Sequence, residues 1–90
     1  PISGDLVAGG VEAETQQALT NLKNVLEAGG SGLERVVKTT VFLRDIADFA
    51  KMNAVYATFF TSEPPARSAF QVGALPKGAA VEIEAVALKK

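Results

Sequence analysis

The segment spanning residues 34–44, ERVVKTTVFLR, is the part of the sequence that most constrains the fold. Its β-branched and apolar residues alternate, which is typical of a β-strand. The alternation gives two sides: Val37, Thr39, Val41 and Leu43 on one, and Val36, Lys38, Thr40 and Phe42 on the other. Both sides are largely apolar, so the segment is predicted to be a central strand that is covered on both faces.

A first helix is predicted before this strand, over residues 11–29. Its apolar residues recur with helical spacing: Val11, Ala18, Leu22, Val25 and Leu26. Gly29 and Gly30 follow the stripe and are typical of a helix end. Upstream of the helix, a turn and a short strand at Leu6–Ala8 are expected.

A second helix is predicted over residues 47–61, after the central strand. Asp45 and Asp48 are its candidate N-caps, and Pro64 and Pro65 cannot continue it. Its stripe predicts a core-facing surface: Phe49, Met52, Tyr56, Phe59 and Phe60.

Two more strands are predicted near the C-terminus, over residues 67–74 and 80–88, separated by a turn at residues 75–78. In the last strand, Val81 and Ile83 share one side, and Glu82 and Glu84 share the other. The order helix–strand–helix–strand–strand indicates one α+β domain over residues 1–90, with both helices on one face of the sheet.

The residue types limit the available chemistry. The 90 residues include no His and no Cys, which excludes disulfides, thiol nucleophiles, His-based triads and metal sites built on His or Cys. Nine basic and ten acidic residues give a net charge of −1, without the basic stripe of a nucleic-acid binder. No apolar run approaches the ~20 residues that span a bilayer. The lack of Cys is compatible with a reducing compartment, and we expect a cytoplasmic protein.

Polar side chains on the last two strands form the candidate site. Arg67, Gln71, Glu82 and Glu84 are expected on one back face of the sheet, mixed with apolar residues that include Ala69, Val86 and Leu88. Such a mixed face is typical of a subunit interface. Arg67 offers a fork for a carboxylate or phosphate, and a nearby Glu could orient water. The pattern alone favours a simpler interpretation, an ion pair between Arg67 and one of the two glutamates.

The sequence also resembles a known family over essentially its whole length. The motif Pro65-Ala66-Arg67-Ser68, the VEIEA segment at residues 81–85, the run at residues 75–77 and Asn53 match in order and spacing. They lie within two longer similar runs, VVKTTVFLRDIADFAKMNAVYATFF and PPARSAFQVGALPKGAAVEIEAVAL. This pattern closely resembles the RidA/YjgF/L-PSP family of imine deaminases, whose members are also labelled endoribonucleases or translation inhibitors.

The resemblance implies a chorismate-mutase-like fold and a homotrimer with active sites between subunits. It implies hydrolysis of 2-iminobutanoate or 2-iminopropanoate to the 2-keto acid and ammonia, without metal or cofactor. Arg67 would bind the substrate carboxylate and Glu82 would position the attacking water. Asn53 and Ala69 would line the substrate site, where Ala69 stands at a position that is often Cys in the family.

The sequence also departs from the family pattern, because members usually begin with a β-hairpin whose Tyr helps to line the pocket. We therefore expect an N-terminally incomplete domain, in which Tyr56 cannot replace that Tyr because its stripe faces the core. Two alternatives to the deaminase remain. One is an endoribonuclease or translation inhibitor, which the charge and the lack of His disfavour. The other is a non-catalytic trimer in which Arg67 binds metabolite carboxylates.

Overall fold

The computed structural model describes residues 10–61 and 64–89 and contains two helices and three strands in the predicted order. The bounds of these elements are α1 Gly10–Ala28, β1 Val36–Leu43, α2 Phe49–Phe59, β2 Ala66–Gln71 and β3 Val81–Ala87. Short 3-10 turns occupy Leu33–Arg35, Ile46–Asp48 and Pro76–Gly78. The strand predicted at Leu6–Ala8 lies outside the described residues.

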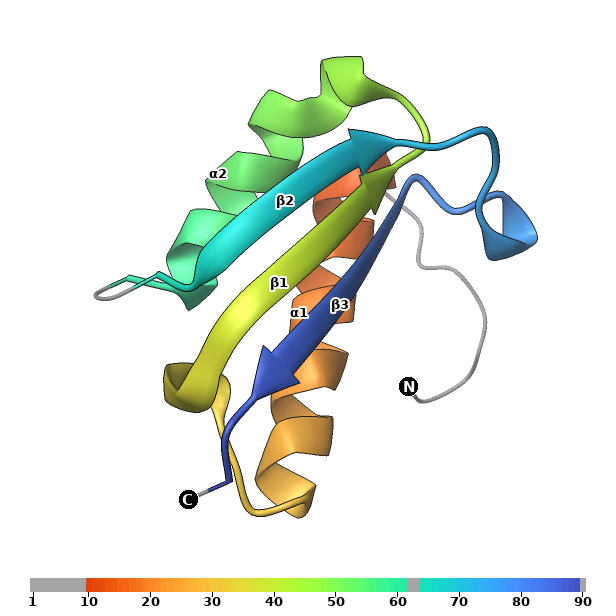
Figure 1. Cartoon of the computed structure of the whole chain (residues 1–90). Helices are drawn as coiled ribbons and strands as arrows, with labels where there is room; N and C mark the ends of the chain where they lie inside the picture. Colours follow the sequence, from red (N-terminus) through yellow and green to blue (C-terminus); the bar gives the residue numbers. More distant parts are fainter. Residues whose placement is uncertain (1–9, 62–63, 90) are drawn as a thin grey trace.

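The three strands form one sheet in the order β2-β1-β3, so β1 is the central strand, as predicted (Figure 1). β2 runs parallel to β1 and β3 runs antiparallel to it. The parallel pair is joined through α2, because parallel neighbours need a long crossover. Among the described strands, each outer strand pairs only with β1, so its register is defined by that pairing.

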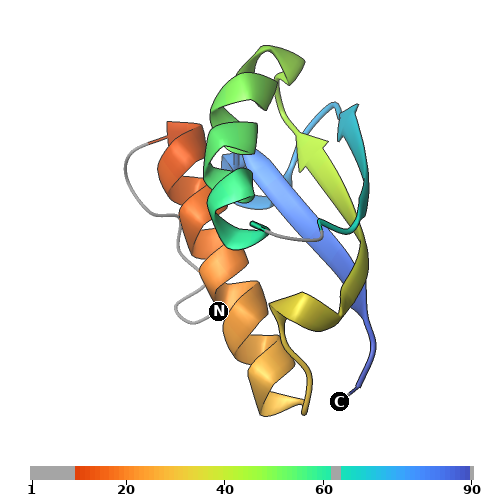
Figure 2. The same ribbon diagram turned by 90° about the vertical axis from the view of Figure 1, so that its left-hand side faces the viewer.

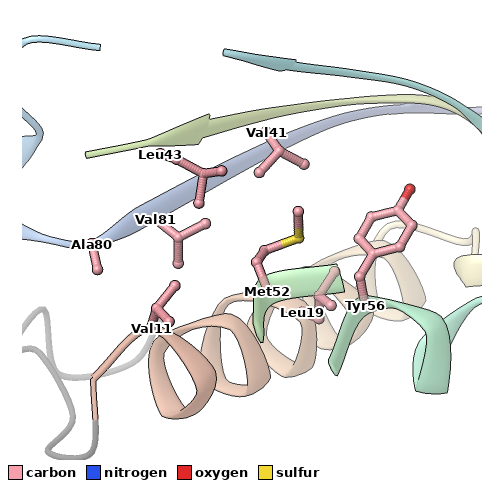
Figure 3. Packing of buried hydrophobic residues seen from close by; sticks show 8 residues of the cluster. All are labelled: Val11, Leu19, Val41, Leu43, Met52, Tyr56, Ala80 and Val81. Atoms are coloured by element: carbon pink, nitrogen blue, oxygen red, sulfur yellow. The ribbon is translucent and has the colours of Figure 1, made fainter. Parts of the chain in front are cut away.

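Both helices cover the same face of the sheet, which confirms the predicted arrangement (Figure 2). Side chains from α1 and α2 point toward the sheet and form the core with residues of β1 and β3 (Figure 3). The second helical stripe is confirmed, since Met52 and Tyr56 are buried and the three phenylalanines of the stripe pack against the core. Burial of this apolar surface is the main force that holds the layers together.

The opposite face of the sheet is not covered by any element among the described residues. It carries Lys38, Thr40 and Phe42 of β1. The expectation that both faces of the central strand are covered is therefore wrong for this chain taken by itself. No helix in the described part of the chain is long and apolar enough to cross a membrane.

A β-bulge changes which valine of β1 enters the core. The register with β3 shifts between Val36 and Lys38. As a result Val36 is buried, whereas Val37 is 45% exposed. Strict alternation had predicted Val37 on the side of Thr39 and Val41. A bulge adds one residue to a strand and so moves the alternation by one position.

The buried side of α1 also differs from the predicted stripe. Thr15 and Leu19 are fully buried, while Val25 is 59% exposed. The buried set follows from Val11 in steps of four residues, which is a helical repeat. Thr15 can occupy the core because its hydroxyl donates to the carbonyl of Val11 at 2.6 Å, so no polar group is left unpaired.

Hydrogen bonds at the helix ends match most of the sequence-based expectations. The carboxylate of Asp45 accepts from the N–H of Ala47 and caps the 3-10 turn before α2. Asp48 occupies the N-cap position of α2 but makes no side-chain cap bond. Gly30, with φ of 84°, follows α1, and the N–H of Ser31 donates to the carbonyl of Leu26. This is the left-handed helix end that glycine favours.

Candidate functional site around Arg67

Arg67 lies on β2 at the edge of the sheet and projects to the side covered by α2. Its partner in the parallel register is Thr39 of β1. Residues paired across neighbouring strands project to the same side of a sheet. Because Thr39 is fully buried beneath the helices, the side chain of Arg67 is directed to that same side.

Three residues of α2 contact the guanidinium of Arg67. Nη1 of Arg67 donates a hydrogen bond to Oδ1 of Asn53. The guanidinium carbon lies 5.1 Å from the ring centroid of Phe49 and 4.7 Å from that of Tyr56. Phe49, Asn53 and Tyr56 are spaced four and three residues apart, so they form one stripe along the helix. Both ring distances are in the range of cation–π interactions.

The ring of Tyr56 is held from two further directions. Its hydroxyl lies 2.7 Å from Oγ1 of Thr39 in a buried hydrogen bond. The ring of Phe60 packs against it at a centroid distance of 4.7 Å. Tyr56 is only 4% exposed and belongs to the hydrophobic core. The surface under the guanidinium is therefore a rigid part of the fold.

This arrangement leaves Arg67 able to bind an anion. A guanidinium has five N–H donors in a fixed fork. Within the described part of the chain, Arg67 uses one of these donors, in its hydrogen bond to Asn53. The residue itself is exposed. The remaining donors match the geometry of a carboxylate or phosphate, which can accept two parallel hydrogen bonds.

The structure separates Arg67 from the two glutamates, in contrast to the prediction of one shared back face. Glu82 pairs with Phe42, and Glu84 pairs with Thr40, on the uncovered side of the sheet. Arg67 projects to the helix-covered side and lies on the other outer strand. The predicted shared face is wrong, and an ion pair between Arg67 and either glutamate of the same chain is excluded. Alternation along one strand shows which of its residues share a side. The pairing register between strands is needed to show which side of one strand lies on the same face as a given side of another.

Ala69 and Gln71 follow Arg67 on the helix-covered side of β2. Ala69 is half-buried and packs against the hydrophobic core. The side-chain carbonyl of Gln71 accepts from the N–H of Ile46 at 2.9 Å. This bond joins the end of β2 to the turn that precedes α2, and it helps to hold Arg67 and the helix stripe together.

Glu82 shares the uncovered face with several apolar side chains. Phe42, its partner on β1, stacks on Phe70 of β2 with a centroid distance of 6.5 Å. Phe70, Val86 and Leu88 are 51%, 59% and 55% exposed. Several large apolar side chains exposed on one face favour interaction with another molecule.

A shallow depression of about 480 Å³ lies elsewhere, along β3. Leu22 of α1 and Ile83, Glu84 and Val86 of β3 are among its lining residues, and Arg67 and Glu82 are not. Nowhere in residues 10–61 and 64–89 do three carboxylates gather closely enough to hold a metal ion. The grouping around Arg67 is therefore the best supported binding site.

Sequence reasoning identified Arg67 and Asn53 but missed the part that Phe49 and Tyr56 take in the site. Both were interpreted as core residues only. The available signal was the position of Asn53, a polar residue between two aromatic residues of the same helical stripe. A polar group at such a position has to find a partner, and here the partner is Arg67.

Comparison with known proteins identifies the family of the chain. The model of the family named Endoribonuclease L-PSP matches residues 1–89. The chain belongs to this family. Among its L-PSP relatives, the 2-iminobutanoate/2-iminopropanoate deaminases of Homo sapiens and Rattus norvegicus are each 54% identical to it over 89 residues. The match includes 99% of the chain and 65% of each deaminase. The chain thus spans just under two thirds of the length of these relatives.

Solved structures of L-PSP relatives share the fold. The YjgF gene product of E. coli is 44% identical with a TM-score of 0.90, over 98% of this chain and 71% of that one. RidA from the Antarctic bacterium Psychrobacter is 44% identical with a TM-score of 0.85, over 90% of this chain and 65% of that one. The predicted YjgF-like α+β fold is therefore confirmed.

Proposed function

We propose that the protein hydrolyses reactive 2-imino acids, such as 2-iminobutanoate and 2-iminopropanoate, to 2-keto acids and ammonia. The observation that carries the proposal is the exposed guanidinium of Arg67, fixed by α2 with donors left for a carboxylate. Relatives that are 54% identical bear the name of this activity.

In the proposed reaction, Arg67 binds the substrate carboxylate through its fork. Water adds to the imine carbon, and the carbon–nitrogen double bond becomes a single bond as the nitrogen takes up a proton. The resulting carbinolamine loses ammonia and forms the carbonyl of the keto acid. Glu82 orients the water and transfers the proton, and Asn53 and Ala69 lie along the substrate. An imine carbon is already electrophilic, so this chemistry needs no metal or cofactor.

Because Arg67 and Glu82 project to opposite sides of one sheet, the Glu82 that serves a given Arg67 has to come from another copy. We therefore propose a homotrimer with its sites between subunits. The exposed apolar face around Phe42 and Phe70 supports such an association, because burying it removes apolar area from water.

A carboxylate-binding protein without turnover is the second candidate. It is favoured by the same separation of Arg67 from Glu82 within the chain, since binding through Arg67 needs no second group. An endoribonuclease is supported by names alone, those of the family and of two solved relatives. A net charge of −1 and the lack of His do not favour it. A cytoplasmic location stays a prediction, supported by the absence of Cys.

Release of ammonia and keto acid from freshly generated 2-iminobutanoate tests the proposal. Hydrolysis above the rate without protein is the expected result. Thermal stabilisation by 2-ketobutyrate without any turnover would favour the binding protein instead. Cleavage of bulk RNA by the purified chain, lost in Arg67→Ala, would favour the endoribonuclease.

A further inference from the structure

We propose that Tyr56, with Phe49, acts as a positioning residue that fixes the plane of the Arg67 guanidinium before any ligand binds. Phe49, Asn53 and Tyr56 together form an arginine cradle. The kinetic part of this inference rests on the proposed deaminase function, whereas the structural part does not.

The cradle holds the guanidinium in two ways. Two rings lie within 5.1 Å and 4.7 Å of the guanidinium carbon, and Asn53 accepts from Nη1. The rings attract the cation without using its N–H donors, since the attraction involves the faces of the aromatic systems. The hydrogen bond then sets the rotation of the fork. Together they fix the direction of the donors that remain for a ligand.

Tyr56 has a feature that Phe49 lacks. Its hydroxyl is bonded to Thr39, the same residue that pairs with Arg67 across β1 and β2. The backbone of Arg67, the side chain of Thr39, the ring of Tyr56 and the guanidinium therefore form a closed circuit of contacts. Each member restrains the next, so the ring cannot tilt independently of the strand that carries Arg67.

Fixing the arginine in advance affects binding more than chemistry. A free arginine side chain loses rotamer freedom when it binds an anion, and a preorganised one has already lost it. Removal of the cradle is therefore expected to weaken the capture of a carboxylate. The chemical step, which takes place at the imine carbon, is expected to change less.

Three variants test the inference. Tyr56→Leu removes the ring, and Tyr56→Phe keeps the ring but removes the hydroxyl. Phe59→Leu is the matched control, because Phe59 lies on the same helix, packs against the same core and makes no described contact with Arg67. All three are compared with the unaltered chain at temperatures where circular dichroism shows that each is folded.

The first measurement is the NMR signal of the Arg67 Nε–H group, assigned with Arg67→Lys. Ring currents shift a proton that lies over aromatic faces. Tyr56→Leu is expected to move this signal toward the position of an unrestrained arginine. Tyr56→Phe is expected to move it by less, because it loses only the bond to Thr39, and Phe59→Leu is expected to leave it in place. An unchanged signal in Tyr56→Leu, or an equal change in Phe59→Leu, would overturn the proposal. This result does not depend on any enzymatic activity.

The second measurement is turnover of 2-iminobutanoate. Tyr56→Leu is expected to raise KM about three- to tenfold with kcat little changed. The KM of Tyr56→Phe is expected to lie between those of the unaltered chain and Tyr56→Leu, because this variant keeps the ring but loses its bond to Thr39. A fall in kcat with unchanged KM would contradict positioning. If the unaltered chain shows no turnover, the proposed function fails, and the NMR signal still decides the role of Tyr56.

Discussion

Arg67 and Glu82 lie on opposite faces of the same three-stranded sheet, on its two outer strands. One chain therefore does not bring together the guanidinium that could bind a carboxylate and the carboxylate that could orient water. A hydrolytic site made of both requires two copies, and this requirement can be tested directly.

Mixing two inactive variants tests whether the site is shared. Arg67→Ala and Glu82→Gln are each expected to lose turnover of 2-iminobutanoate. When the two are unfolded, mixed in equal amounts and refolded together, some sites receive an intact Arg67 from one chain and an intact Glu82 from another. Random assembly of a closed oligomer would restore about a quarter of the activity. No recovery, in a mixture shown to contain hetero-oligomers, would contradict a shared site.

Removal of the guanidinium tests the role of Arg67 itself. Arg67→Ala is expected to lower kcat/KM about a hundredfold or more, since it removes two charge-assisted hydrogen bonds to the carboxylate. It should also abolish thermal stabilisation by 2-ketobutyrate. Arg35→Ala is the control, because Arg35 is also an exposed arginine, lies on the turn before β1 and takes no part in the contacts described around Arg67. Equal losses in both variants would point to a general effect of charge.

The uncovered face of the sheet is expected to mediate association. Phe70→Asp places a charge on this face and should shift the protein toward the monomer in light scattering after size exclusion, because an unpaired buried charge is unfavourable. Val25→Asp is the matched control on the helical side, since Val25 and Phe70 are exposed to similar degrees, 59% and 51%. An unchanged mass for Phe70→Asp would show that contacts through this face are not required.

The buried bond between Thr39 and Tyr56 is expected to contribute to stability. Thr39→Val leaves the Tyr56 hydroxyl buried without its partner and should lower the free energy of unfolding by about 1–3 kcal/mol. The double change Thr39→Val with Tyr56→Phe removes both polar groups and should regain part of that loss. Urea denaturation of the single and double variants measures the coupling. Additive effects would indicate that the hydroxyls do not depend on each other.

The sequence predicted most of the layout because periodicity is a local property. Phe49, Met52 and Tyr56 recur with helical spacing, and each of them faces the core as predicted. Val36 was misassigned because a bulge depends on the partner strand, which periodicity does not contain. Thr15 was not part of the predicted stripe, which was built from apolar residues, and the structure shows that its hydroxyl is satisfied by a carbonyl of its own helix.

The candidate site was predicted in part for a similar reason. Arg67 and Asn53 were identified through a resemblance in their motifs, and the structure brings them together. Glu82 was predicted on the same face as Arg67, but the structure places the two residues on opposite faces of the sheet. β2 and β3 are not neighbours, so which of their sides face the same way depends on how each pairs with β1, the strand between them. Each strand considered alone gives no information about it.

The consecutive order of β1, α2 and β2 has a consequence for how the protein folds. The described partners of Arg67 all lie between Thr39 and Tyr56 in the sequence. Short separations make loop closure less demanding in entropy, and such contacts tend to form early. α1 and β3 come from the two ends of the described chain and meet only after long loops have closed. The arginine cradle is thus expected to form early together with β1, α2 and β2, and α1 and β3 are expected to pack onto this unit afterwards.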